Sequence, residues 1–189
     1  MKTIANKEIL MGADFAGLPL KNAVAEFLEA NGWKVTHIGV TDPDDPDPMM
    51  YHRVGLLAGS MIANGEFERA IIFCGTGMGI HVAASKCPHV HAAVCESVPS
   101  ALRCVTANNC NVLAMGAFYV APKTAIAMAD AFLNHKLGDG YEEWDGFYEY
   151  HKFGYDETEN FDYEEFKKNG FEFKTPQPKL DDQPKDMTI

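Results

Sequence analysis

The sequence predicts an α/β fold, a mostly parallel sheet with helices on both faces, followed by a C-terminal extension. Three observations support this prediction. Over residues 1–138, short apolar runs alternate with runs of helical spacing, and strands separated by helices pair in parallel through right-handed crossovers. Glycine-rich stretches directly follow two of the apolar runs. Residues 139–189 differ from the rest in charge and in aromatic content.

The elements are expected in the following order. A first strand is predicted from Ile4 to Met11, and a helix from Leu18 to Asn31, where apolar residues recur at helical spacing and Gly32 follows the helix end. The prolines within 41–48 remove backbone donors and fix φ, so this acidic segment is predicted to be a loop. Further strands are expected at 33–40, 69–73, 91–95 and 111–115, and further helices at 51–64, 80–85, 97–107 and 122–133.

The composition excludes several classes of protein. The chain has 27 acidic and 16 basic residues, a net charge of −11, and no basic cluster, which argues against binding to nucleic acid or to an anionic membrane. It has no apolar run long enough to span a bilayer, and its first residues lack the features of a signal peptide. Five cysteines without a close CxxC pair disfavour a disulfide framework and a structural zinc site. We expect a cytoplasmic protein without metal or cofactor.

The extension carries most of the net negative charge. Residues 139–189 hold 15 acidic and 6 basic groups, and 12 of the 21 aromatic residues. A disordered acidic tail would be poor in aromatics, so residues 141–173 are expected to pack on the main domain or on a partner subunit. Residues 175–189, with three prolines, are expected to be extended. We therefore divide the chain into a domain at 1–138 and an extension at 139–189.

The run Cys74-Gly75-Thr76-Gly77-Met78-Gly79 is the most informative motif. Its three glycines allow several backbone N–H groups to converge between a strand and a helix, where they can bind an anion or a developing oxyanion. Cys74 lies at the strand end, where a thiolate can accept a proton. The alternatives are a simple tight turn and an inert core thiol.

Three segments together resemble a known family. GADFAGLPLKNAVAEFLEANGWKVTHIGV, AIIFCGTGMGIHVAASKCPHVHAAVCES and SALRCVTANNCNVLAMGA occur in this order and are similar to the family of ribose-5-phosphate isomerase B and galactose-6-phosphate isomerase. The resemblance covers roughly residues 3–135. It implies a Rossmann-like domain, a homodimer or homotetramer with sites at the subunit interface, and aldose–ketose isomerisation through an enediolate without a metal.

The resemblance also implies roles for single residues. Cys74 matches the base that moves a proton between C1 and C2 of the sugar, and Asp14 matches a carboxylate that contacts the substrate. The adjacent polar contact is Asn108. The cradle for the enediolate oxygen corresponds to the hydroxyl of Thr76 and the amides of Gly75, Gly77 and Gly79.

The chain departs from the family pattern at three places. Phe15 stands where the family has a histidine after the aspartate, and Ala107 stands where it has the histidine that opens the sugar ring. The arginines that hold the substrate phosphate have no counterpart after Arg103. These departures argue against ribose 5-phosphate as the substrate, because a phosphate is usually held by arginine.

Other residues are candidates to replace the missing contacts. Tyr51, His52 and Arg53 follow the acidic loop, and His81 follows the glycine-rich motif; each of the two histidines is also compatible with a surface or packing role. The sequence thus predicts a sugar isomerase for a sugar or sugar acid other than ribose 5-phosphate. The alternatives are a ribose-5-phosphate isomerase with replaced contacts and a non-catalytic sugar-binding or regulatory subunit.

Overall fold

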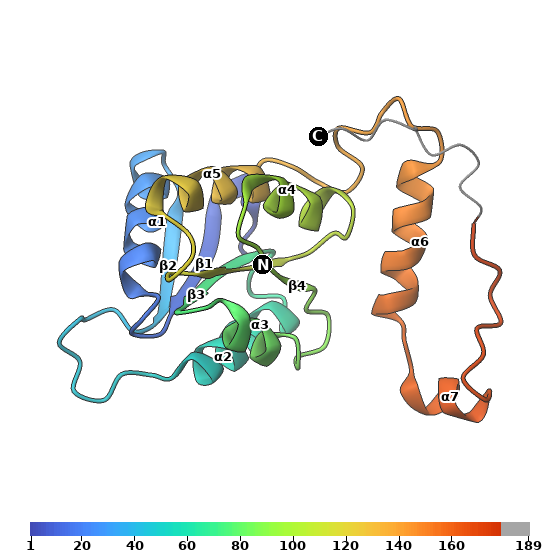
Figure 1. Cartoon of the computed structure of the whole chain (residues 1–189), viewed down its shortest axis with the longest axis horizontal. Helices are drawn as coiled ribbons and strands as arrows, with labels where there is room; N and C mark the ends of the chain where they lie inside the picture. Colours follow the sequence, from blue (N-terminus) through green and yellow to red (C-terminus); the bar gives the residue numbers. More distant parts are fainter. Residues whose placement is uncertain (179–189) are drawn as a thin grey trace.

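The computed structural model describes residues 1–178; the rest of the predicted extended end lies outside the described residues. Five parallel strands form one sheet in the order β2-β1-β3-β5-β4. Figure 1 shows helices on both faces of this sheet. The prediction of a Rossmann-like αβα fold with a parallel sheet is confirmed. The strands are β1 (Glu8–Ala13), β2 (Lys34–Gly39), β3 (Ala70–Cys74), β4 (Ala92–Val94) and β5 (Val112–Gly116).

The helices divide the core into two layers. Alternate side chains of a strand point to opposite faces, so Ile9 and Met11 join one apolar cluster while Leu10 joins the other. The first layer is covered by α1 (Leu18–Ala30), α4 (Val98–Thr106) and α5 (Pro122–Leu133), and the second by α2 (Tyr51–Ala63) and α3 (Met78–Ala84).

The first strand begins later than the sequence predicts. Residues Ile4–Asn6 form a short 3₁₀ helix, and the Asn6 amide donates to the Thr3 hydroxyl at its start. Lys7 then adopts a left-handed φ of 54°, which ends the helix and turns the chain into β1. Periodicity alone does not separate an apolar helical turn from a strand, because both occupy only a few residues.

The strand order places a switch point beside β3. The chain runs from β1 outward to β2 and then returns to the other side of β1 to form β3. In open parallel sheets, ligands bind beyond the carboxyl ends of the strands at such a point. The residues after β1 and at the end of β3 are Asp14 and Cys74.

The extension forms an arm, defined here as residues 139–178, with helices α6 (Phe147–Glu159) and α7 (Tyr163–Lys168). Phe147 is only 3% exposed and packs on Tyr141, Trp144 and His151. The far end of the arm differs from the expectation, because its rings stay exposed. Phe161, Phe171 and Phe173 each contact the Phe166 ring, and these three rings and Tyr163 are exposed.

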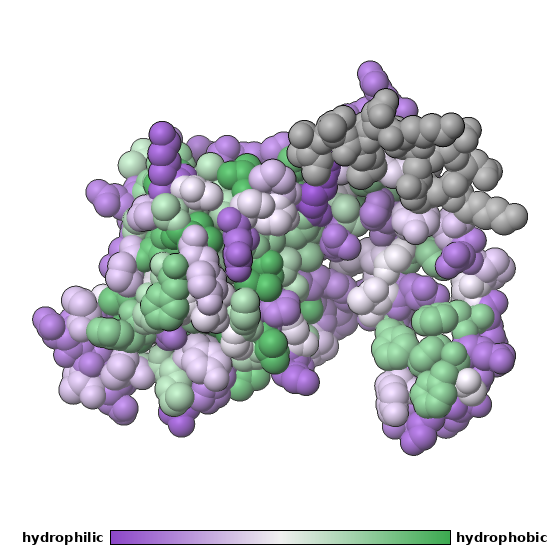
Figure 2. Space-filling view, viewed as in Figure 1, coloured by the Kyte–Doolittle hydropathy of each residue, from purple (hydrophilic) through white to green (hydrophobic). Residues whose placement is uncertain are grey.

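Figure 2 shows the apolar patch of this far end set apart from the main domain.

Along the part of the chain that the structure describes, none of the helices has the length and apolar character needed to cross a membrane.

Candidate active site

A cavity of about 410 Å³ lies at the switch point. The carboxyl ends of β1 and β3, the start of α2 and the segment after β5 supply its walls. Its lining therefore comes from segments that are far apart in the sequence: Asp14, Ala16, Tyr51, Cys74, Gly75, Thr76, Gly79 and Phe118.

Cys74 is the last residue of β3 and is 4% exposed. The N–H of Gly77 donates a hydrogen bond to Cys74 Sγ at 3.1 Å, which orients the sulfur and stabilises negative charge on it. Gly77 has a φ of 76°, and a Cβ on it would lie 2.9 Å from the backbone N of Gly116. Only glycine therefore allows the loop to turn back on the sulfur without strain.

Two aromatic rings cover the glycine-rich loop. A Cβ on Gly75 would lie 2.5 Å from the Phe118 ring, and a Cβ on Gly79 would lie 2.5 Å from the Tyr51 ring. The glycines thus permit both rings to approach the loop backbone. The resulting cavity has apolar side walls and a polar floor, which is typical of small-molecule sites.

Asp14 is held at the edge of the cavity by backbone groups. Its Oδ1 accepts a hydrogen bond from the Gly17 N–H at 2.8 Å, and its own N–H donates to the Phe73 carbonyl at 3.2 Å. Burial raises the pKa of Asp14 above its ordinary value, and the backbone bonds from Gly17 and Ala16 oppose this only in part. Because part burial raises its pKa, the Asp14 carboxyl can take up and release a proton at a higher pH than an exposed carboxyl.

Thr76 supplies a free donor. Its Oγ1 accepts a hydrogen bond from the Met78 N–H at 3.3 Å. The hydroxyl hydrogen is therefore left to donate into the cavity, because a hydroxyl both donates and accepts.

The structure brings together only some of the residues that the sequence predicts. Those at the cavity or bonded to its thiol are Asp14, Tyr51, Cys74, Gly75, Thr76, Gly77 and Gly79. His52 and Arg53 do not line it, since successive positions of a helix point in different directions. The Nε2 of His81 is hydrogen-bonded to the carbonyl oxygen of Ala92 at 3.1 Å, away from the cavity.

Asn108 lies near the amino ends of the strands, whereas the Cys74 cavity lies at their carboxyl ends. Asn108 precedes β5, whereas Cys74 pairs with Gly116 at the far end of that strand. Val112 and Gly116 are four residues apart, which corresponds to roughly 13 Å of strand. Within one chain, Asn108 therefore lines a different cavity from Cys74.

Phe118 was not predicted from the sequence. It directly follows β5, and β5 is the neighbour of β3 in the sheet. The rule that carboxyl ends of parallel strands meet at one edge identifies it, once the strand order is known. Within residues 1–178, no three His, Cys, Asp or Glu side chains gather in a way that could hold a metal ion.

Comparison with known proteins identifies the family. Residues 9–145 match the family model described as Ribose/Galactose Isomerase. The 4-deoxy-4-sulfo-D-erythrose isomerase of Clostridium sp. is 39% identical over 72% of this chain and 85% of its own. The D-erythrulose-4-phosphate isomerase of Pectobacterium atrosepticum is 34% identical, covering 70% and 86%. Escherichia coli ribose-5-phosphate isomerase B is 34% identical, covering 71% and 88%.

Solved structures agree with this result. Clostridium thermocellum ribose-5-phosphate isomerase B superposes with a TM-score of 0.70 at 29% identity, covering 86% of this chain and 99% of its own. The Mycoplasma genitalium enzyme with bound ribulose-5-phosphate gives 0.70 at 26% identity, covering 84% and 96%. With the glycine-rich cavity described above, these matches show that the chain belongs to the ribose/galactose isomerase family and is an aldose–ketose sugar isomerase.

Proposed function

We propose that the Cys74 cavity interconverts an aldose and a ketose of four carbons that carry an anionic group on C4. Two relatives are named for such compounds, a 4-deoxy-4-sulfo-erythrose and an erythrulose 4-phosphate. A third, from Mycolicibacterium smegmatis, is 36% identical and is also named a D-erythrulose-4-phosphate isomerase.

Ala107 is the observation that carries this proposal. It stands where the resembled family has the histidine that opens the sugar ring. Ribose 5-phosphate closes a five-membered ring through its C4 hydroxyl, so its ring must open before isomerisation. A four-carbon sugar with phosphate or sulfonate on C4 has no hydroxyl there and stays open. An enzyme for such a substrate therefore does not need the ring-opening acid.

In this proposal, the Cys74 thiolate removes the proton from C2 of the aldose and returns it to C1. The charge that develops on the substrate oxygen is stabilised by loop amides and by the Thr76 hydroxyl. One such donor typically lowers the barrier by about 3–4 kcal/mol. Asp14 contacts a substrate hydroxyl from the other side of the cavity.

We also propose that two copies of the chain form a homodimer in the cytoplasm, and that each copy completes the site of the other. Exposed apolar residues in and near the cavity walls support this, because large exposed apolar patches usually mark an interface. Tyr51 and Phe118 line the cavity. The elements that form its walls or lie beside them carry the exposed residues Met78, Val82, Val94 and Tyr119. A two-fold dimer in which the amino ends of the strands of one copy face the carboxyl ends of the strands of the other would bring Asn108 of one copy to the Cys74 cavity of the other.

A substrate comparison tests the proposed chemistry. The isomerisation of erythrulose 4-phosphate, 4-deoxy-4-sulfo-erythrose and ribose 5-phosphate can be followed by NMR. We expect kcat/KM to be at least ~10²-fold higher for one of the four-carbon sugars. A value for ribose 5-phosphate within the ordinary range of about 10⁴–10⁸ M⁻¹s⁻¹, with slower four-carbon sugars, would instead support a ribose-5-phosphate isomerase with replaced contacts.

A Cys74→Ala variant separates an enzyme from a sugar-binding subunit. We expect unchanged circular dichroism and a kcat lower by several orders of magnitude, because the variant lacks the base. Turnover near the wild-type rate would show that Cys74 is not the base.

Sedimentation equilibrium tests the dimer, and a particle at the monomer mass of 20.9 kDa would contradict it.

A further inference from the structure

A second cavity, of about 570 Å³, lies between the main domain and the arm. The end of α4 and the start of β4 form one side, and α6 forms the other. Asn108 and His151 both line it, together with Tyr150 and Tyr155. The arm therefore places an imidazole beside the asparagine that the proposed dimer assigns to the site of the partner subunit.

His151 is held in a defined environment. Its ring lies 4.2 Å from the Phe147 ring, between centroids. Burial lowers the pKa of His151, and a hydrogen bond to the backbone of Ala107 opposes this only in part. The imidazole is thus neutral at neutral pH, and the ring nitrogen that is not bonded to Ala107 is left to take up and release a proton.

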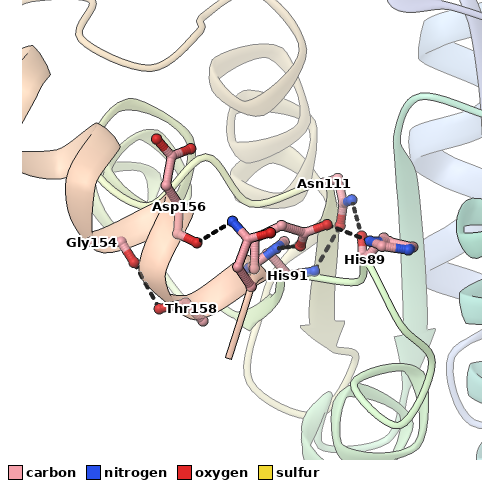
Figure 3. A network of polar contacts seen from close by, with 8 residues as sticks. His89, His91, Asn111, Gly154, Asp156 and Thr158 are labelled. Carbon is pink, nitrogen blue, oxygen red and sulfur yellow. Dashed lines mark hydrogen bonds and ion pairs between the residues drawn. The ribbon is translucent and has the colours of Figure 1, made fainter. Parts of the chain in front are cut away.

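Contacts along the arm fix the position of α6. The Glu159 carboxylate bridges His89 and His91, with Oε2 at 2.6 Å from His91 Nε2. The Asn111 side chain holds the turn between the two histidines, since it accepts from the His91 N–H at 2.9 Å and donates to the His89 carbonyl at 2.8 Å. Figure 3 shows His89, His91 and Asn111 beside the C-terminal part of α6.

The arm is also held nearer its base. Arg103 of α4 lies over the Tyr141 ring at 4.3 Å, and the Tyr155 ring packs on the ring of His91 at 4.7 Å. His151 lies between these contacts in the sequence. Its position relative to Asn108 is therefore set by the body of the protein at both ends.

Two proton transfers have to take place in the Cys74 cavity. Aldose–ketose isomerisation moves a proton between two carbons and a second proton between two oxygens. The thiol can serve the carbons. For the oxygens, the described part of one chain offers Asp14 and Thr76 in this cavity but no imidazole, the usual side chain for proton transfer near neutral pH.

We infer that His151 of each subunit enters the Cys74 cavity of the partner subunit beside Asn108 and transfers the proton between the two substrate oxygens. This inference rests on the proposed isomerase and its dimer. The thiolate first takes the C2 proton, which leaves an oxyanion on C1. The imidazole then accepts the proton of the C2 hydroxyl and delivers it to this oxyanion. The thiol proton then passes to C1 and the carbonyl forms at C2, so both groups return to their starting states.

Hybrid dimers test this arrangement. Differently tagged Cys74→Ala and His151→Asn chains are co-expressed, and the hybrid is isolated with both tags. One of its two sites then combines an intact Cys74 with an intact His151 from the other chain. We expect the hybrid to regain about half of the wild-type rate, whereas both parent dimers stay strongly impaired. His37→Asn, on β2, serves as a control histidine and should leave the rate unchanged.

A hybrid no more active than its parents, beside an active wild type, overturns the inference alone. A wild type inactive on all three sugars named above overturns the proposed function and, with it, the inference.

Isotope exchange adds a readout that a packing role would not change. In D₂O, the thiolate exchanges the carbon-bound proton even when the oxygen proton is not transferred. We expect His151→Asn to lose roughly 10²-fold or more in conversion, the usual contribution of a general acid–base group, while deuterium still enters the recovered substrate. If exchange and conversion fall by the same factor, His151 only supports the fold and the inference is wrong.

Discussion

Replacing Gly77 by alanine tests the architecture of the active-site loop. Gly77 has a φ of 76°, and an added Cβ would lie 2.9 Å from two backbone atoms, the N of Gly116 and the carbonyl carbon of Met115. Neither atom belongs to a flexible side chain that could move away. Gly65 is a matched control, because its φ is 69° and no atom lies within 4 Å of an added Cβ.

The expected magnitudes follow from these two environments. A left-handed conformation costs a residue other than glycine about 1–2 kcal/mol, and Gly65→Ala should lose only this amount. Overpacking against a fixed neighbour adds about 1–3 kcal/mol. Gly77→Ala should therefore lose roughly 2–5 kcal/mol, a large part of the stability of a typical domain.

Equilibrium unfolding in urea measures both variants. We expect the midpoint for Gly77→Ala to fall well below that for Gly65→Ala with a similar dependence on denaturant. The turnover number should fall only in Gly77→Ala, because its amide holds Cys74 Sγ at 3.1 Å. Equal loss of stability in the two variants would refute the close approach of Gly77 to β5.

Two further predictions concern titratable groups. Burial raises the pKa of Asp14, so its charge destabilises the folded state as the pH rises through the ordinary value of 3.8. Asp14→Asn should therefore raise the urea midpoint at pH 7 but not at pH 3, while it lowers turnover; equal midpoints at pH 7 would contradict this. For Glu159, burial opposes ionisation, but the bonds from His89 and His91 outweigh it and the pKa lies below 4.5. The contact stabilises the arm above this pH and is lost as the pH falls through the lowered pKa, so Glu159→Gln should speed hydrogen exchange in α6 at pH 7 and change little at pH 3. Unchanged exchange at pH 7 would show that the bridge does not hold α6.

Most of the fold follows from the sequence because the strands of the main domain are short, apolar and separated by helical runs. The helix expected at 122–133 has these bounds in the structure, and the strand expected at 69–73 is shifted by one residue. The predicted start of the first strand was wrong, because an apolar pattern does not reveal that Lys7 adopts a left-handed conformation. The paired rings at the far end of the arm also escaped prediction, because counting aromatics does not show what they pack against.

The site was predictable where it depends on local backbone. Cys74 and the glycines belong to one loop, so their proximity follows from the sequence alone. Phe118 and Ala16 reach the cavity through strand order, which is a property of the whole sheet. The position of His151 beside Asn108 depends on how the arm packs, and no motif in the sequence indicates it.

Arg69 gives the arm a fixed base. Its buried guanidinium donates to the carbonyls of Phe132 and His135, where α5 ends and the arm approaches. The chain between the fixed end of α5 and Glu159 therefore has a limited length. It acts as a tether, so the contact of Glu159 with His89 and His91 forms within one chain. Short tethers give effective concentrations in the millimolar range. Exchange of arms between two copies would have to compete with that concentration, so at micromolar protein each arm should remain on its own main domain.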